Sequence, residues 1–263
     1  MGNLTRSAVS FGLAASLTRV GIAGLRAEPP GGRARWERKN HAGRTVELYA
    51  GAAAAVAAAV GAGRVRPAAG LAVLAAGACG AYDDVVGAGD PRRGFRDHLR
   101  ALRDGEVTSG AVKLFGISAA GLVAGALLKE RAVDKVLAGV VIAGAAHFVN
   151  LVDLRPGRAA GAAVALAAPG LLRPGAGAEL AAVALGAAAA VLPDDLGERS
   201  MLGDTGAHAL GAVLGAAVVA GNGRAGLFAH AAALVAAAAC GDKVSEAARS
   251  WGGGHVPLTH SCE

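Results

Sequence analysis

The sequence predicts an all-α membrane protein: a polytopic bundle of about nine transmembrane helices forming one domain over residues 1–263. Hydrophobic residues make up 54% of the chain, the mean hydropathy is +0.45, and the apolar residues occur in blocks of about twenty. Forty-one glycines and only 3% aromatic residues suit helices that approach one another through small side chains. The alternative is an alanine-rich soluble helical protein, but the uncharged blocks reach the length that spans a bilayer.

Each apolar block is a predicted span, and charged or Gly/Pro-containing segments separate the blocks. The first block follows a single early arginine, so it could instead be a signal peptide, but it extends to spanning length. The predicted spans are 7–26, 46–62, 67–86, 109–128, 135–154, 158–172, 177–193, 206–221 and 224–241.

The basic residues predict the orientation of this bundle. With the N-terminus outside, seventeen of the 26 Lys and Arg residues fall on the inner side and eight on the outer side, while Arg19 lies within the first span. The positive-inside rule therefore favours an outside N-terminus and an inside C-terminus.

Charge and cysteine content exclude other classes. The net charge is +6, but the basic residues are spread over loops without interleaved aromatics, so no nucleic-acid partner is indicated. Cys79, Cys240 and Cys262 form neither a disulfide framework nor a zinc-binding spacing. Residues 95–103 form a basic amphipathic helix that suits an anionic membrane surface, although a positive-inside loop has the same composition.

Asp204 is the centre of the predicted site. It stands in Met201-Leu-Gly-Asp-Thr-Gly206, directly before an uncharged helix that we expect to begin near Gly206. A carboxylate at the mouth of a membrane helix is costly unless it binds something, and the helix dipole there favours negative charge. The alternative is that Asp204 only caps this helix.

Two further segments carry charge into the apolar blocks. Asp83 and Asp84 lie at a predicted helix C-terminus, where the dipole disfavours carboxylates, so they require a cation unless they are simply solvated. Lys113 is four residues into an apolar span, and its charge should face an anion or a carboxylate.

The fifth predicted span ends in three polar residues. His147, Asn150 and Asp153 follow one another at i, i+3 and i+6, which would place them along one inward helix face. His147 alone could be a packing histidine. In the predicted topology these residues, Asp83–Asp84 and Asp204 all reach the cytoplasmic side, as a shared aqueous site requires.

Together, the ordered motifs resemble the polyprenyl-phosphate N-acetylhexosamine-1-phosphate transferase superfamily, the MraY/WecA group. The resemblance covers about residues 36–215 and rests on Asn40-His-Ala-Gly-Arg-Thr-Val46, Asp83-Asp-Val-Val-Gly87, Lys113, Asn150-Leu-Val-Asp-Leu-Arg-Pro-Gly157 and Met201-Leu-Gly-Asp-Thr-Gly206. Members of the family move a phospho-sugar from a UDP-sugar onto a membrane polyprenyl phosphate with Mg²⁺ and release UMP.

The resemblance implies roles for particular residues. Asp204 would bind Mg²⁺ (or Mn²⁺), Asp83 and Asp84 would act near the lipid phosphate, one of them as a base, and Lys113 would neutralise phosphate. The nucleotide side would involve Asn150, Asp153, Arg155 and His147, and substrate phosphate or sugar would meet Asn40, Gly43 and Arg44. The implied partners are undecaprenyl or decaprenyl phosphate, a UDP-sugar, the lipid bilayer of the plasma (inner) membrane and a second copy in a homodimer.

Three departures from the family pattern affect these expectations. The segment after Asp153 lacks the family's second Asp or Asn and carries Arg155, which suggests an altered donor. Only His255 and His260 stand in for the family's histidine-rich loop, and members usually continue into another span beyond the position of Glu263. The alternatives are therefore a family member that binds lipid phosphate or a partner protein without turnover, and a small transporter with Asp153 and Asp204 as an ion relay.

Overall fold

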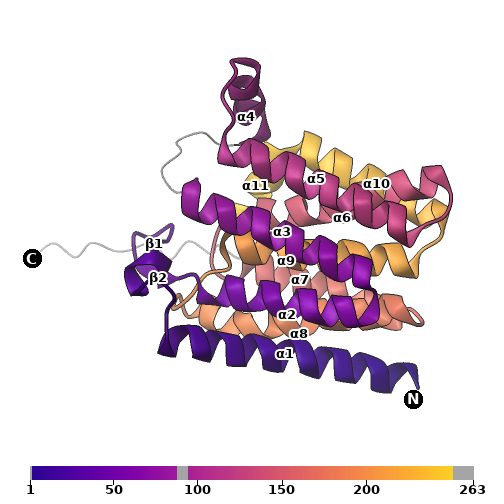
Figure 1. The fold of residues 1–263 in the computed structure, drawn as a ribbon, viewed down its shortest axis with the longest axis horizontal. Helices are drawn as coiled ribbons and strands as arrows, with labels where there is room; N and C mark the ends of the chain where they lie inside the picture. Colours follow the sequence, from indigo (N-terminus) through magenta and orange to yellow (C-terminus); the bar gives the residue numbers. More distant parts are fainter. Residues whose placement is uncertain (1, 88–93, 251–263) are drawn as a thin grey trace, which may run out of the picture.

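The computed structural model describes residues 2–87 and 94–250, and these are nearly all helical (Figure 1). The long helices run side by side in one bundle. The elements in chain order are α1 (Asn3–Ala27), η1 (Arg33–Trp36), β1 (Glu37–Lys39), β2 (Thr45–Glu47), α2 (Tyr49–Val65), α3 (Pro67–Val86), α4 (Gly94–Arg103), α5 (Ser109–Leu128), α6 (Ala132–Leu151), α7 (Arg158–Ala167), η2 (Ala168–Leu172), α8 (Ala176–Leu196), α9 (Gly203–Gly221), α10 (Arg224–Ala239) and α11 (Gly241–Ser250).

Each of the nine predicted apolar segments contains a helix, and the short basic helix predicted at 95–103 is α4. Local signals explain several boundaries: Pro67 opens α3, and the Thr108 hydroxyl caps α5 by accepting the Ala111 N–H at 3.1 Å. Two predicted boundaries at the site were wrong. Helix α6 ends at Leu151, before Asp153, and α9 begins at Gly203, so that Asp204 lies inside its first turn.

Six helices in the described part of the chain are long and apolar enough to cross a membrane: α1, α3, α5, α6, α8 and α9. Helices α10 and α11 together would make a seventh, but the chain bends by 84° between them. Helix α2 has 17 residues, or about 25 Å at the α-helical rise, which is short of the roughly 30 Å hydrocarbon layer. A membrane-embedded bundle is therefore supported, whereas nine crossings and their orientation stay predictions.

A β-hairpin stands between α1 and α2, where the sequence predicted only a loop and the start of a span at residue 46. Strands β1 and β2 pair antiparallel, with Arg38 opposite Val46. The edge of β2 continues into the segment before α9: the Met201 N–H donates to the Glu47 carbonyl at 2.8 Å, and the Glu47 N–H donates to the Arg199 carbonyl at 3.2 Å. The hairpin therefore joins the N-terminal third of the chain to the segment that carries Asp204.

Helix α9 occupies the centre of the bundle, in contact with α2, α3, α6 and α8. The predicted close packing through small residues is confirmed there. A Cβ added to Gly80 on α3 would lie 2.3 Å from the Asp204 carbonyl oxygen, which is too close for any larger residue without a shift of backbone. Gly80 thus lets α3 and the first turn of α9 touch.

The polar elements gather at one end of the bundle, on the left in Figure 1. The hairpin, the C-terminus of α3 and the connection from α8 to α9 lie there, while α4 projects sideways from the helices near the same end. We call this the site end. The acidic segments predicted to converge do meet at this end, whereas the side of the membrane that it faces stays a prediction.

Candidate functional site

Three charged side chains from three helices meet at the site end. The Lys113 ammonium of α5 donates to Asp83 Oδ2 of α3 at 2.6 Å and also contacts Asp204 Oδ2 of α9. All three side chains are largely buried, with 16–23% of each exposed. Lys113 thus faces carboxylates, as its place in an apolar span predicted, and Asp83 has the cation that a helix C-terminus requires.

Asp84, the next residue on α3, binds the N-terminus of α9. Its Oδ1 accepts the Asp204 N–H at 3.0 Å, and its Oδ2 accepts the Thr205 N–H at 3.0 Å and the Thr205 hydroxyl at 2.6 Å. These are the first N–H groups of a helix, which have no partner within it. The sequence left open that Asp204 caps α9, but the cap is Asp84, which comes from another helix. The Asp204 carboxylate therefore remains in contact with Lys113.

A cavity of about 160 Å³ lies beside this cluster, and we call it the Asp153 cavity. Three segments far apart in sequence line it: the hairpin, the loop after α6 and the connection from α8 to α9. The lining residues are Lys39, Asn40, His41, Val46, Asp153, Leu154, Arg155, Pro156, Asp195, Glu198, Ser200 and Met201. The cavity brings together three of the sequence motifs, those at 40–46, 150–157 and 201–206, at one opening.

Asn40, Gly43 and Arg44 form the tip of the hairpin at this cavity. The Asn40 side-chain oxygen accepts the Ala42 and Arg44 N–H groups at 2.9 and 3.0 Å, and Gly43 takes a φ of +74° that completes the turn. Asn40 Nδ2 donates to Glu198 at 2.6 Å, and the Arg44 guanidinium also binds Glu198. Asn40 lines the cavity as predicted, but Gly43 shapes the loop and Arg44 is paired with an acid.

Asp153 lies in the loop between α6 and α7 and faces other acids. Burial raises the pKa of the Asp153 carboxyl well above its usual value, and the charges of Asp195, Asp204 and Asp84 raise it further. Asp195, in the last turn of α8, accepts the Gly157 N–H at 3.0 Å and so ties this loop to the bundle. The acids around Asp153 therefore favour its protonated form, while Lys39 and Arg155 line the same cavity and bring positive charge to it.

The predicted alignment of His147, Asn150 and Asp153 on one helix face was wrong, because α6 ends at Leu151. Asp153 and Arg155 line the cavity, whereas His147 and Asn150 are not among its described lining residues. The His147 ring instead packs edge-on against His208 of α9, with ring centroids 5.4 Å apart. His147 therefore packs inside the bundle, which agrees with the alternative interpretation of it as a packing histidine.

His208 was not predicted from the sequence as a residue of the site. It is fully buried, and its Nδ1 donates to the Asp204 carbonyl at 2.7 Å, since a carbonyl can only accept. Its position four residues after Asp204 was the available signal. Asp195 also had a signal, because Asp194–Asp195 repeat at the end of α8 the acidic pair at the end of α3, but nothing local marked Glu198.

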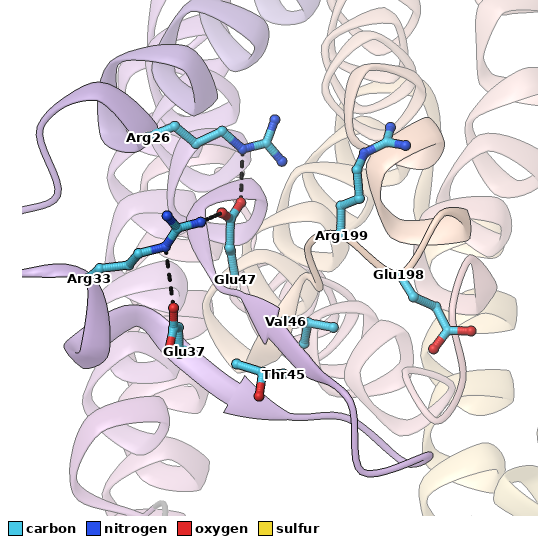
Figure 2. A pocket seen from close by; sticks show the side chains of 8 residues that line it. All are labelled: Arg26, Arg33, Glu37, Thr45, Val46, Glu47, Glu198 and Arg199. Atoms are coloured by element: carbon cyan, nitrogen blue, oxygen red, sulfur yellow. Dashed lines mark hydrogen bonds and ion pairs between the residues drawn. The ribbon is translucent and has the colours of Figure 1, made fainter.

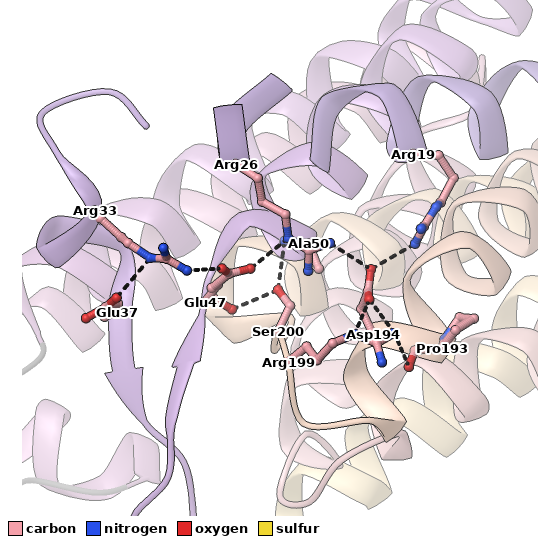
Figure 3. Close-up of polar contacts among 10 residues, drawn as sticks. All are labelled: Arg19, Arg26, Arg33, Glu37, Glu47, Ala50, Pro193, Asp194, Arg199 and Ser200. Atoms are coloured by element: carbon pink, nitrogen blue, oxygen red, sulfur yellow. Dashed lines mark hydrogen bonds and ion pairs between the residues drawn. The ribbon is translucent and has the colours of Figure 1, made fainter. Parts of the chain in front are cut away.

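A second charged cluster stabilises the segment before α9 (Figure 3). Asp194, only 2% exposed, accepts hydrogen bonds from Arg19 Nη1 and Arg199 Nε, each at 2.8 Å. Its backbone carbonyl accepts the Arg199 and Ser200 N–H groups, and the Ser200 hydroxyl donates to the Glu47 carbonyl at 2.8 Å. The Arg19 charge inside the first span thus has a buried partner, and the strand-like segment 199–201 is held from both sides.

The carboxylates of the Asp83–Lys113–Asp204 cluster suit Mg²⁺. This ion is usually held by one or two carboxylates together with substrate phosphate oxygens, rather than by an all-protein cage. Asp83 and Asp204 direct oxygens to the common point where the Lys113 ammonium lies, and among the described residues no three His, Cys, Asp or Glu side chains form a metal cage. The residues therefore fit a metal held by two carboxylates and the oxygens of a ligand.

The histidine candidates His255 and His260 and the third cysteine, Cys262, lie outside the described residues. Comparison of the chain with models of protein families and with curated protein sequences gives no match.

Proposed function

We propose that this protein is a Mg²⁺-dependent phosphoglycosyl transferase of the inner membrane, with its site end facing the cytoplasm. In this reaction a phosphate oxygen of a polyprenyl phosphate attacks the sugar-bearing phosphorus of a UDP-sugar. The P–O bond to the uridylate breaks, so the products are a lipid-linked sugar pyrophosphate and UMP. Such a product is a precursor for an envelope polymer.

The observation that carries the proposal is the meeting of Lys113 with Asp83 and Asp204 beside the Asp153 cavity. Phosphoryl transfer needs charge neutralisation and positioning more than covalent chemistry, and a lysine with two carboxylates supplies parts of both kinds. The cluster lies at the ends of membrane helices, where a phosphate on a lipid tail and a soluble nucleotide can meet.

The residues divide into those that meet the reacting groups and those that position them. Asp83 and Asp204 would hold Mg²⁺, which supplies neutralisation of phosphate charge, and Lys113 would move from the carboxylates to the substrate phosphate. Asp84 orients the first turn of α9, whose dipole favours phosphate. A phosphate nucleophile is largely ionised near neutral pH, so a general base is not required and Asp83 can serve as a ligand.

The Asp153 cavity is the proposed donor side. The Arg155 guanidinium can pair with a diphosphate, while Asn40 and Asp153 offer the amide and carboxyl groups that hydrogen-bond a base or a sugar. The volume of about 160 Å³ accommodates part of a nucleotide sugar rather than the whole molecule. Closure around a complete donor therefore requires the hairpin or the segment 198–201 to move.

One observation favours a second function, the binding of lipid phosphate without turnover. Lys113 bridges the two carboxylates that would hold the metal, and a permanent ion pair there would exclude Mg²⁺. The transporter hypothesis has no such support, because Asp83, Asp84 and Asp204 meet at one end of the bundle instead of following a path through it.

The deciding experiment is UMP release by the detergent-purified protein with undecaprenyl phosphate and a panel of UDP-sugars. We expect release with one donor in Mg²⁺ and none with chelator. Silence across the panel, in protein that unfolds cooperatively and binds undecaprenyl phosphate, would replace the transferase by the binding function.

A further inference from the structure

A second cavity, of about 420 Å³, lies between the C-terminus of α1, the hairpin and the segment before α9 (Figure 2). We call it the arginine cavity. Its lining consists of Arg26, Arg33, Glu37, Thr45, Val46, Glu47, Glu198 and Arg199. Val46 and Glu198 also line the Asp153 cavity, so β2 and Glu198 form the wall between the two.

The acids around this cavity are already engaged. Glu47 accepts from Arg26 Nε at 2.8 Å and from Arg33 Nη2 at 3.1 Å, and Glu37 lies 3.3 Å from Arg33 Nε. Glu198 accepts a hydrogen bond from Asn40 and pairs with Arg44, both at the tip of the hairpin. No acid that lines the arginine cavity is therefore left for a further cation.

Donors, by contrast, exceed acceptors. Asp194 is shared by Arg19 and Arg199 and lies 3.6 Å from Arg26 Nη1. Arg26 Nη2 is buried and has no hydrogen-bond partner among the described residues. A buried N–H without an acceptor is costly, and a guanidinium offers paired donors with the geometry of phosphate oxygens. In Figure 2 the Arg26 and Arg199 guanidinium groups extend toward the same side of the cavity.

The position of Arg26 in the chain also suits a lipid headgroup. Arg26 is in the last turn of α1, a helix long and apolar enough to span the bilayer, and basic residues at such ends reach the headgroup layer. We infer that the arginine cavity is a second anion site, which binds a phosphate group through Arg26, Arg33 and Arg199, separately from the Asp83–Lys113–Asp204 cluster. The phosphate can belong to an anionic phospholipid or be free in solution.

This site bears on the candidate active site through Arg199. The residue lines the arginine cavity, its backbone pairs with β2, and Ser200 and Met201 after it line the Asp153 cavity. A bound phosphate would hold Arg199 and thereby the segment that leads to Asp204. Occupancy of the anion site is expected to order the wall between the two cavities.

The test measures binding to the detergent-purified full chain of three probes: dioctanoyl phosphatidylglycerol, dioctanoyl phosphatidylcholine and inorganic phosphate. We expect saturable binding of phosphatidylglycerol that R33Q weakens about tenfold, the effect of one lost charge-assisted hydrogen bond. The Arg33 side chain is 70% exposed, so this variant should fold. R35Q removes an equal charge two residues away, outside the lining, and should bind as wild type.

The arms distinguish the source of the phosphate. Binding of both phosphatidylglycerol and inorganic phosphate, each weakened by R33Q, assigns the site to the phosphate group alone, and binding of the lipid only assigns it to a membrane headgroup. No binding, phosphatidylcholine binding that equals that of phosphatidylglycerol and is unchanged by R33Q, or identical affinities in R33Q and R35Q would overturn the inference. D204N should leave this binding unchanged, so a failure of the transferase proposal and a failure of the anion site are separate results.

Discussion

The two charged clusters at the site end have opposite compositions. Around Lys113 one cation is shared by two carboxylates, with further acids close by, whereas around Asp194 one buried carboxylate is shared by several arginines. Both clusters act on the same short segment, which runs from Asp194 through Arg199 to Asp204.

The difference in composition suggests that the first cluster binds a ligand and that the second stabilises the backbone. A cluster with surplus carboxylates favours a cation, and at the mouth of α9 that cation can bring a phosphate with it. A cluster with surplus guanidinium groups holds its single buried acid firmly, so the backbone around it is well defined. Substitutions in the first cluster should therefore change turnover, and substitutions in the second should change stability.

The largest expected effect is on catalysis. We expect D204N to lower UMP release by about 10²–10³-fold, as does the loss of one electrostatic group at a reacting phosphate or carbonyl. The melting temperature should change little, because Lys113 keeps Asp83 as a partner. D97N on α4, which removes an exposed acid of the same size, should retain full activity; wild-type turnover by D204N would remove this cluster from the mechanism.

The Asp194 cluster should respond in the opposite way. D194N is expected to reduce the free energy of unfolding by about 2 kcal/mol, less than for a fully buried pair because Arg19 and Arg199 are half-exposed. Unfolding of the purified protein in graded SDS measures the change. D134N, which breaks a single pair with the half-exposed Arg224, is the matched control and should have the smaller effect. A stable but inactive D194N would erase the division between the clusters.

Asp84 lies between these extremes, because it belongs to the acidic cluster but binds backbone. We expect D84A to reduce the free energy of unfolding by about 1 kcal/mol, the usual effect of losing a helix cap, and to lower activity with it. D84N keeps one carbonyl acceptor and should recover part of the stability. Loss of activity in D84A with unchanged melting would instead assign Asp84 to the reacting groups.

The smallest effect concerns pH. The raised pKa of Asp153 means that the folded protein binds its proton more tightly than the unfolded chain does, so ionised Asp153 opposes folding above that pKa. D153N should therefore melt at a higher temperature than wild type at pH 8. The difference should disappear as the pH falls below the raised pKa, toward the usual range of a carboxyl. An equal difference at pH 8 and pH 4 would show that charge is not the cause.

Much of the fold followed from local pattern. Every long helix corresponds to an apolar block between charged segments. Such a block forms a helix because in a bilayer its backbone has to satisfy its own hydrogen bonds. The same reasoning predicted that Lys113 would face an anion or a carboxylate and that Asp83 would need a cation, because an isolated charge in an apolar span is costly. These inferences depend on residues close in sequence or on the free-energy cost of burying a single charged side chain.

The partners themselves were decided by the tertiary structure. Asp84 caps a helix that begins more than a hundred residues later, and Asp194 binds an arginine from the first helix. The hairpin has strands of three residues, too short for a periodic signal, and β2 also pairs with the distant segment 199–201. By itself, then, the sequence determined where helices form and which charges need partners, since both are local free energies. Only the packing of α3, α5 and α9 decided which carboxylate holds a helix and which remains for a ligand, because that choice depends on distances between distant segments.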